Sequence, residues 1–210
     1  DPENRILEYH TKDNPHNGMD DFSHLQIIEK TAQAMFGKPQ SVAQRVAQLE
    51  YVHYEWVRLT TESLRRKKFD CSGVQYWMYN DIWPAFGWSH LDYWTFAKAA
   101  YYADVQANLP VIGTIEECEQ AVRVWVCNDL LKPVTGQLEV RLHGWSGPAI
   151  WTKRIDFSVA KNVSVPVLEI TTGELGEQFN EQTMLVAEIS GQFGSHRAWL
   201  YRGLPRQMQL

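Results

Sequence analysis

The most informative stretch of the sequence lies near its centre and reads Gly73-Val74-Gln75-Tyr76-Trp77-Met78-Tyr79-Asn80-Asp81-Ile82-Trp83-Pro84, continuing to Trp88-Ser89. Its first half is apolar and aromatic, as in a buried strand, and an Asn-Asp pair followed by proline ends it. Buried aromatic side chains that lead into a loop with amide and carboxylate groups are typical of a concave binding site. A core strand followed by an ordinary turn gives the same pattern, so the stretch alone leaves both interpretations open.

Composition places the chain among globular proteins. Of its 210 residues, 44% are hydrophobic and 21% are charged, a balance that favours a packed core over disorder. The formal net charge of -5 gives no electrostatic basis for binding nucleic acid. No apolar run reaches the roughly 18 residues that a membrane-spanning helix needs. We therefore expect neither nucleic acid nor a membrane as a partner.

The cysteines and histidines predict no metal site. Cys71, Cys118 and Cys127 are odd in number and lack metal-ligand spacing, so we expect reduced thiols, which favour a reducing compartment such as the cytoplasm. The histidines show no i, i+4 pairing and no neighbouring cysteine that would indicate zinc. A P-loop, a dinucleotide fingerprint and a serine nucleophile elbow are also missing. We expect no cofactor.

Helical periodicity surrounds the aromatic stretch. It predicts one helix at about 21–36 and a longer one from Ser41, whose hydroxyl caps the helix while Gln44 reaches back. The basic run 65–68 falls at the end of this second helix, where we expect a solvated helix end rather than a phosphate site. A third helix is predicted from Ser89 or Asp92 to about residue 106.

The second half of the chain changes character. After the linker 108–110 the hydrophobic period becomes two, and alternating segments with turns between them predict strands at 121–126, 138–142, 150–157, 163–168, 184–189 and 198–201. Short strands at such spacing predict an antiparallel sandwich of immunoglobulin-like type.

The first half has a strand-pairing problem. The segment 73–79 is apolar on both faces, like a parallel strand covered on both sides, yet no second strand is predicted near it. A buried strand without neighbours leaves its backbone donors and acceptors unpaired. We therefore expect this half to be a piece of a larger α/β enzyme.

Carboxylates near the stretch do not identify a catalytic pair. A glycosidase needs two carboxyl groups on either side of the bond that it cleaves. The spacing of Asp70, Asp81 and Asp92, or of Glu8 and Asp13 upstream, does not single out such a pair. Asp92 is expected to cap a helix and Asp81 to orient its loop.

A family resemblance rests on an ordered set of uncommon residues. The set resembles the β-mannosidase branch of glycoside hydrolase family 2, and it consists of the run 73–84, Trp88-Ser89, Asp92-Tyr93, Lys98-Ala99 and Tyr102. The sequence departs from the family at Met78 and Tyr79, where Gln and Leu are usual, and at Phe86-Gly87. These departures leave the sugar preference open.

The resemblance implies a fold and a set of site residues. Residues 1–107 would form the terminal part of a (β/α)8 barrel, with 73–79 as its last strand, and residues 108–210 an immunoglobulin-like sandwich. The rest of the barrel would be the chain's partner, and a glycoside or oligosaccharide its substrate. By the same resemblance, the substrate-binding residues would be Trp77, Asn80, Asp81, Trp83 and His10.

The resemblance also implies what the sequence lacks. The family's acid/base glutamate follows an asparagine, and its nucleophile follows a serine; neither motif stands in a suitable place here. Both catalytic glutamates would precede residue 1, so we expect an inactive chain belonging to a retaining exo-glycosidase. One alternative is a β-galactosidase, β-glucuronidase or exo-β-glucosaminidase. Others are a purely structural pair of domains, or a carbohydrate-binding sandwich that uses Trp125, Trp145, Trp151 or Trp199 as a platform.

Overall fold

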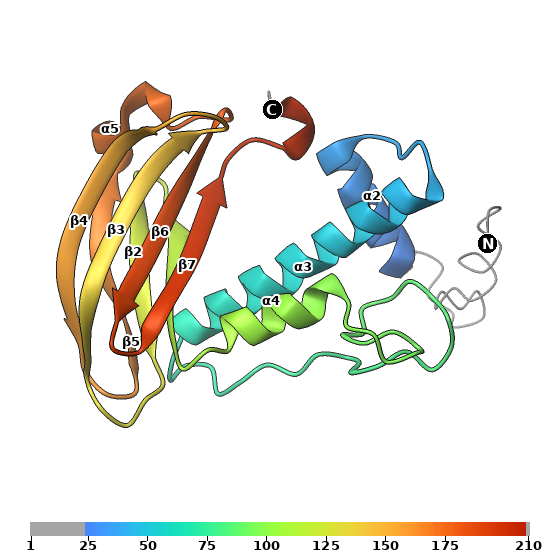
Figure 1. The fold of residues 1–210 in the computed structure, drawn as a ribbon, viewed down its shortest axis with the longest axis horizontal. Coiled ribbons are helices and arrows are strands. Elements are labelled where there is room, and N and C mark those ends of the chain that lie inside the picture. Colours follow the sequence, from blue (N-terminus) through green and yellow to red (C-terminus); the bar gives the residue numbers. More distant parts are fainter. Residues whose placement is uncertain (1–23, 209–210) are drawn as a thin grey trace. The chain divides into compact units, whose positions relative to one another are not determined.

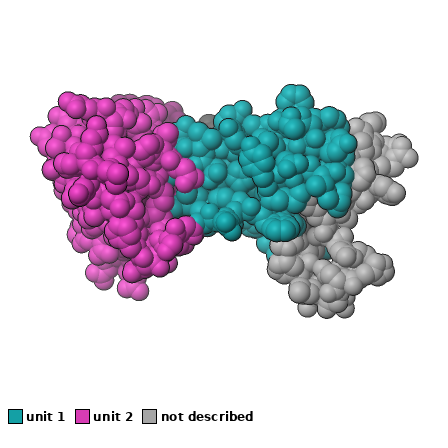
Figure 2. Space-filling view, turned by 90° about the horizontal axis from the view of Figure 1, so that it is seen from below, with its two compact units in different colours: residues 1–61, 74–107 teal, residues 62–73, 108–210 magenta. Residues whose placement is uncertain are grey.

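The structure, a computed structural model, describes residues 24–208, in which a helical part precedes a β-sandwich (Figure 1). The chain forms two compact units. Unit 1 comprises residues 1–61 and 74–107, and unit 2 comprises residues 62–73 and 108–210 (Figure 2). None of the described helices combines the length and the apolarity needed to cross a lipid bilayer.

Two helices and one loop residue form a small core in unit 1. The first helix, α2, spans His24–Phe36, and α3 spans Val42–Arg66. Ile28 and Ala32, four residues apart on α2, are buried against side chains of α3 and against Phe86. The helix predicted at 21–36 is therefore confirmed from His24 onward, and its first residues lie outside the described part of the chain.

The start of α3 is capped as the sequence predicts. The Ser41 hydroxyl accepts a hydrogen bond from the Gln44 amide at 3.1 Å, and the Gln44 side chain accepts one from the Gln40 amide at 2.7 Å. These bonds satisfy backbone donors that the helix itself leaves unpaired. A capping box would place the bond to the Gln44 side chain on the Ser41 amide, and the structure places it on the Gln40 amide, one residue earlier.

The buried face of α3 is partly polar, which the apolar spacing did not predict. Trp56 and Leu59 are exposed, whereas Glu55 and Arg58 are buried and form an ion pair at 2.7 Å. Charged side chains tolerate burial when they neutralise each other and share hydrogen bonds, as this i, i+3 pair does.

The third predicted helix begins about ten residues later than expected. The helix α4 spans Ala99–Ala107. Before it, Asp92 closes a tight turn, because its carboxylate accepts a hydrogen bond from the Phe96 amide at 2.8 Å. Thr95 has a φ of 70°, which no α-helix contains. The expectation that Ser89 or Asp92 opens a helix is wrong because Asp92 caps a turn instead.

The strand predicted at 73–79 is wrong as a strand. These residues form no strand in the described part of the chain: the backbone bends at Trp77 and Tyr79, and an isolated bridge joins Asn80 to Leu91. The physical reason is the one that the sequence raises: no neighbouring strand is available within residues 24–208 to complete a ladder.

The sandwich consists of two antiparallel sheets (Figure 1). The three-stranded sheet has the order β1 (Val111–Glu117), β2 (Ala121–Asn128), β5 (Val163–Thr171). The four-stranded sheet has the order β4 (Ala149–Val159), β3 (Val134–Gly144), β6 (Thr183–Gly191), β7 (Gly194–Tyr201). Two short helical turns, α5 (Thr172–Leu175) and η1 (Gly176–Gln178), connect β5 to β6, and η2 (Pro205–Gln207) follows β7.

Alternating side chains build the core of the sandwich. Val122, Val124 and Val126 of β2 are completely buried, and so are alternate residues of β3 and β6: Leu138, Val140, Leu142, Leu185, Ala187 and Ile189. Each such valine, leucine or isoleucine side chain contributes about 1.5–3 kcal/mol by leaving water. The predicted immunoglobulin-like sandwich is therefore confirmed. The first strand, β1, was missed because its first five residues are all buried and show no alternation.

The basic end of α3 is bonded to the sandwich residues of unit 2. The Arg65 guanidinium donates to the Leu109 carbonyl at 2.8 Å and pairs with Asp129 at 3.1 Å. Lys68 pairs with the same carboxylate at 2.5 Å, and the Ser164 hydroxyl donates to the Arg65 carbonyl at 2.8 Å. The expectation of a solvated helix end is wrong for Arg65 and Lys68 because Asp129 lies beside them.

Candidate functional site

The segment 74–80 combines one anchored aromatic ring with two exposed ones. The Tyr76 hydroxyl donates to the Val57 carbonyl at 3.0 Å and is hydrogen-bonded to the Thr61 hydroxyl at 2.5 Å, so the Tyr76 side chain faces α3. Trp77 is 80% exposed and Tyr79 is 66% exposed. The segment is therefore attached to α3 by one aromatic residue and leaves the next two uncovered.

Backbone hydrogen bonds join the end of this segment to the residues before α4. The amides of His90 and Leu91 donate to the Tyr79 carbonyl at 3.0 and 2.8 Å, and the Asp81 amide donates to the Leu91 carbonyl at 3.0 Å. The Lys98 amide donates to the His90 carbonyl at 2.9 Å. These bonds join three parts of the chain next to the loop 82–88 into one hydrogen-bonded layer: residues 79–81, residues 89–91 and residue 98.

Hydrogen bonds to the buried Lys98 side chain also hold the loop 82–88. The Lys98 ammonium donates to the Asp81 carboxylate, to the Ser89 hydroxyl at 2.9 Å and to the Gly87 carbonyl at 3.3 Å. Asp81 and Lys98 are only 1% and 8% exposed. We refer to these four residues as the Lys98 cluster. A buried ammonium and carboxylate are tolerated here because each meets the other and further polar atoms share the bonds.

Histidine and tyrosine rings lie behind this layer. The ring of His90 is buried and lies 5.1 Å from that of Tyr76, and its Nε2 is 3.6 Å from the Asp104 carboxylate. Burial lowers the pKa of His90, although Asp104 acts in the opposite direction. Burial raises the pKa of the Tyr76 phenol, which a hydrogen bond to Thr61 partly offsets. Both rings therefore stay uncharged near neutral pH.

The start of α4 is held by a carboxylate of α3. Glu50 accepts a hydrogen bond from the Ala99 amide at 2.7 Å, which satisfies one of the donors that open α4. Burial raises the pKa of Glu50, and this hydrogen bond and the Lys98 charge lower it in part. No pattern in the sequence indicates this contact, because Glu50 lies 49 residues from its partner.

The five predicted site residues differ in their exposure to solvent and in whether the structure describes them. Trp77, Asn80 and Trp83 are exposed, and the Asn80 side chain donates to the Asp81 carbonyl at 3.1 Å. The Asp81 carboxylate is buried in the Lys98 cluster, so its interaction is with Lys98 rather than with solvent. The fifth, His10, lies outside the described residues.

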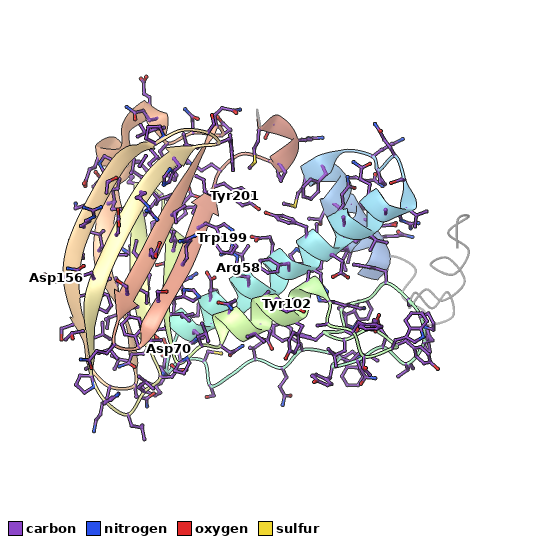
Figure 3. The ribbon with its side chains drawn as sticks, in the orientation of Figure 1. Arg58, Asp70, Tyr102, Asp156, Trp199 and Tyr201 are labelled. Carbon is purple, nitrogen blue, oxygen red and sulfur yellow. The ribbon has the colours of Figure 1, made fainter. Side chains whose placement is uncertain are left out.

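Further exposed apolar side chains, which the sequence analysis did not predict as site residues, lie on the same part of the chain: Ile82, Tyr93, Trp94, Phe96 and Tyr102. Tyr102 is on α4 (Figure 3). Their density between residues 77 and 102 is visible in the sequence. Their exposure is not, because aromatic residues are more often buried than exposed.

The described carboxylates near the site supply no catalytic pair. Asp81 is bonded to Lys98, Asp92 caps the turn before Phe96, and Asp70 is exposed at the end of α3 (Figure 3). Glu8 and Asp13 lie outside the described residues. No group of three His, Cys, Asp or Glu side chains that could hold a metal ion occurs within residues 24–208.

The sandwich carries a polar concavity. A hollow of about 370 Å³ is lined by charged and polar side chains, among them Glu139, Arg154, Asp156 and Glu188. Glu139 is paired with Arg154 at 2.9 Å, and Glu188 with Arg141 at 3.1 Å. The four tryptophans considered as a platform, Trp125, Trp145, Trp151 and Trp199, are all half-buried. The aromatic surface of unit 1 is therefore the stronger candidate.

Comparisons with known proteins agree on one family. A family model described as a mannosidase Ig/CBM-like domain matches residues 120–200. Mouse β-mannosidase is 28% identical over 127 residues, which are 60% of this chain and 14% of the mouse protein. The chain is therefore similar, over part of its length, to the β-mannosidase-like branch of glycoside hydrolase family 2. The family resemblance that the sequence suggests is thereby confirmed, and the family model supports it through residues 120–200.

Other members of glycoside hydrolase family 2 match as well. An exo-β-D-glucosaminidase from Streptomyces avermitilis is 31% identical over 94 residues, 43% of this chain and 10% of that protein. The crystal structure of β-D-mannosidase from Dictyoglomus thermophilum covers 100% of this chain and 25% of its own, with a TM-score of 0.86 and 20% identity. The matched region is thus a quarter or less of each of these relatives, and similarity to the family alone does not define the sugar.

Proposed function

We propose that this chain supplies one wall of the substrate site of a retaining exo-glycosidase, together with the immunoglobulin-like domain that follows it. Terminal β-mannosides are the proposed substrates. Residues 1–107 would be the last part of a (β/α)8 catalytic barrel and residues 108–210 the sandwich domain. The rest of the barrel would come from sequence outside these 210 residues.

The observation that carries this proposal is the contrast among the aromatic residues of segment 74–80. Tyr76 is bonded to α3, whereas Trp77 and Tyr79 are uncovered. A barrel strand in the intact protein would account for this contrast, because such a strand has the outer helices on one side and the barrel interior on the other. The missing ladder partners of the segment are explained in the same way, since neighbouring barrel strands would provide them.

The exposed residues suit a sugar. An indole face binds the C–H face of a pyranose ring, so Trp77 would form the floor beside the terminal sugar. Asn80 and Trp83, which we call the rim residues, would contact its hydroxyl groups and its edge. Asp81 would act by fixing the rim through Lys98, and His10 would add a polar group from a preceding loop.

The chemistry would follow from two carboxylates outside this chain. In a retaining glycosidase, one carboxylic acid protonates the leaving oxygen while a second carboxylate attacks the sugar and forms a covalent glycosyl-enzyme, which water then hydrolyses. Asp81 and Asp92, the described carboxylates nearest the aromatic surface, are both engaged in structural hydrogen bonds. The chain by itself would therefore hold sugar weakly and cleave nothing.

Hydrolysis of aryl glycosides tests the proposal. The 210-residue chain alone is expected to release no nitrophenol from an aryl β-mannoside, whereas the intact protein that includes the preceding coding sequence is expected to do so. Aryl β-glucosaminide, β-galactoside and β-glucuronide tested in parallel would define the sugar. Turnover by the 210-residue chain alone would contradict the assignment of the catalytic carboxylates, and an intact protein inactive on every substrate would contradict the enzyme assignment.

Substitution of Trp77 tests the proposed floor of the site. Trp77→Ala in the intact protein is expected to raise KM for the best substrate by about tenfold or more, because stacking on the bound sugar is lost. Leu131→Ala, which truncates an 84% exposed side chain of the sandwich, is the control and should leave KM unchanged. Equal effects of the two substitutions would exclude a specific role for Trp77.

A further inference from the structure

Residues at the two ends of one loop supply the hydrogen-bond partners of the Lys98 ammonium group. The three hydrogen-bond partners of its ammonium group belong to Asp81, Gly87 and Ser89, which lie near the beginning and the end of the loop that carries Trp83. An ammonium group has three N–H donors, so the Lys98 cluster satisfies all of them. The Nζ atom also lies 5.9 Å from the centre of the Phe86 ring. The buried Lys98 ammonium group is thus hydrogen-bonded to residues at both ends of the loop 82–88.

The value of this cluster lies in specifying a conformation rather than in adding stability. Removing a carboxylate and an ammonium group from water costs about as much as their attraction returns, so apolar replacements of similar size often fold as well. Exposed pairs contribute still less. A buried pair does penalise every loop conformation that separates its members. The loop 82–88 is therefore restricted to the arrangement in which Asp81 and Ser89 both reach Lys98.

The restricted loop carries the rim residues. Asn80 directly precedes Asp81, and its side chain donates to the Asp81 carbonyl at 3.1 Å. Trp83 follows two positions later. The Lys98 amide donates to the His90 carbonyl at 2.9 Å, and the His90 amide donates to the Tyr79 carbonyl at 3.0 Å. The backbone of Lys98 is therefore hydrogen-bonded to the segments on either side of the loop that its side chain also holds. A displacement of Lys98 would be transmitted to Asn80 and Trp83 through these bonds.

We propose that Lys98 is a positioning residue for sugar binding, which fixes the rim residues Asn80 and Trp83 through its bonds to Asp81, Ser89 and the Gly87 carbonyl. The inference rests on the proposed function, because it assigns the rim to the binding of a terminal sugar. Lys98 itself is shielded from solvent and does not touch the substrate. Its loss should therefore weaken sugar binding while leaving the bond-breaking carboxylates in place.

The test compares Lys98→Met with the double variant Asp81→Asn, Lys98→Met in the intact protein. The single variant leaves a buried carboxylate without its partner and is expected to fold poorly. The double variant removes both charges and is expected to fold with native thermal stability. Lys161→Met, which removes an exposed lysine of the sandwich, is the control. Two readouts are needed: hydrogen exchange of the amides of residues 79–98, and kinetics on an aryl β-mannoside.

In the double variant, exchange of the His90, Leu91 and Lys98 amides is expected to accelerate at least tenfold. KM is expected to rise at least tenfold with kcat within a factor of about three, since only binding common to ground and transition states is lost. Unchanged exchange, unchanged kinetics, or a fall in kcat at constant KM would each overturn the proposal. Failure of the wild-type protein to hydrolyse any aryl glycoside would instead refute the proposed function, and accelerated exchange would still show that the Lys98 cluster holds the loop.

Discussion

The buried side chain of His90 makes the stability of unit 1 depend on pH. Its ring is enclosed beside Tyr76, with the Asp104 carboxylate 3.6 Å from Nε2. Burial lowers its pKa below the usual value of 6.5, so the folded chain favours the neutral ring. Above pH 6.5 both the folded and unfolded states hold it neutral. Below pH 6.5 the unfolded state takes up a proton more readily, and stability falls.

Acidification is therefore expected to destabilise unit 1 through His90. The free energy of unfolding should decrease as pH falls from 6.5 toward the lower pKa of the folded state. His90→Phe, which keeps a ring against Tyr76 but cannot be protonated, should flatten this part of the profile. Urea unfolding monitored between pH 7 and 5 provides the measurement. An unaltered slope in the variant would show that another group causes the loss.

At the scale of elements, the chain depends on polar side chains that close helix ends and strand connections. Glu50 closes the start of α4 through the Ala99 amide. In the sandwich, the completely buried Asn128 joins the end of β2 to two connections, because its amide nitrogen donates to the carbonyls of Lys132 and Ala160. Its side-chain oxygen accepts from the Leu130 amide at 3.0 Å. Such contacts fix where an element begins or ends.

Glu50→Ala is expected to lower the free energy of unfolding by about 1–2 kcal/mol, because the Ala99 amide loses its acceptor. Glu50→Gln keeps an acceptor oxygen and removes a partly buried charge. Since the pKa of Glu50 is raised, folding at neutral pH works against its ionisation, and the Gln variant should be at least as stable as wild type there. Thermal unfolding at pH 7 would reveal the order Gln, wild type, Ala. A Gln variant as unstable as the Ala variant would contradict this reasoning.

Asn128→Ala is expected to cost about 3 kcal/mol of stability, because one backbone amide and two carbonyls lose their partner at a buried site. Leu131→Ala lies in the same connection but alters a side chain that is 84% exposed. That control should change stability by less than about 0.5 kcal/mol. Guanidinium denaturation of both variants gives the comparison, and similar midpoints would mean that the Asn128 bonds contribute little.

At the scale of the whole molecule, the exposed aromatic residues between 77 and 102 are the main anomaly. Scattered apolar residues are normal on a protein surface, but Trp77, Tyr79, Trp94 and Phe96 are each more than half exposed. Monomers seldom leave large apolar patches uncovered. In the proposed enzyme, the rest of the barrel and the substrate would cover them.

The isolated 210-residue chain is consequently expected to self-associate at micromolar concentration. Replacing Trp77 and Phe96 together by serine should shift sedimentation toward the monomer. Leu131→Ser, which changes an exposed apolar residue of the sandwich, should not. A wild-type chain that sediments as an ideal monomer at every concentration would show that this surface needs no cover.

The sequence by itself determined the periodic parts of this protein. The strands from Ala121 onward, the Ser41 cap and the helix ending at Phe36 depend on local alternation, capping chemistry and helical spacing. The family was also recognisable in residues 73–102, because uncommon residues there occur in a fixed order. Local physics is sufficient where neighbours in sequence are neighbours in space.

Only the tertiary structure decided the contacts that bring distant residues together. It buried Asp81 against Lys98, 17 residues away, and joined Arg65 to Leu109, 44 residues away. It also left Trp77 exposed, because no strand within residues 24–208 pairs with residues 73–79. Burial and pairing depend on what surrounds a side chain in space, and residue type and spacing do not specify that environment.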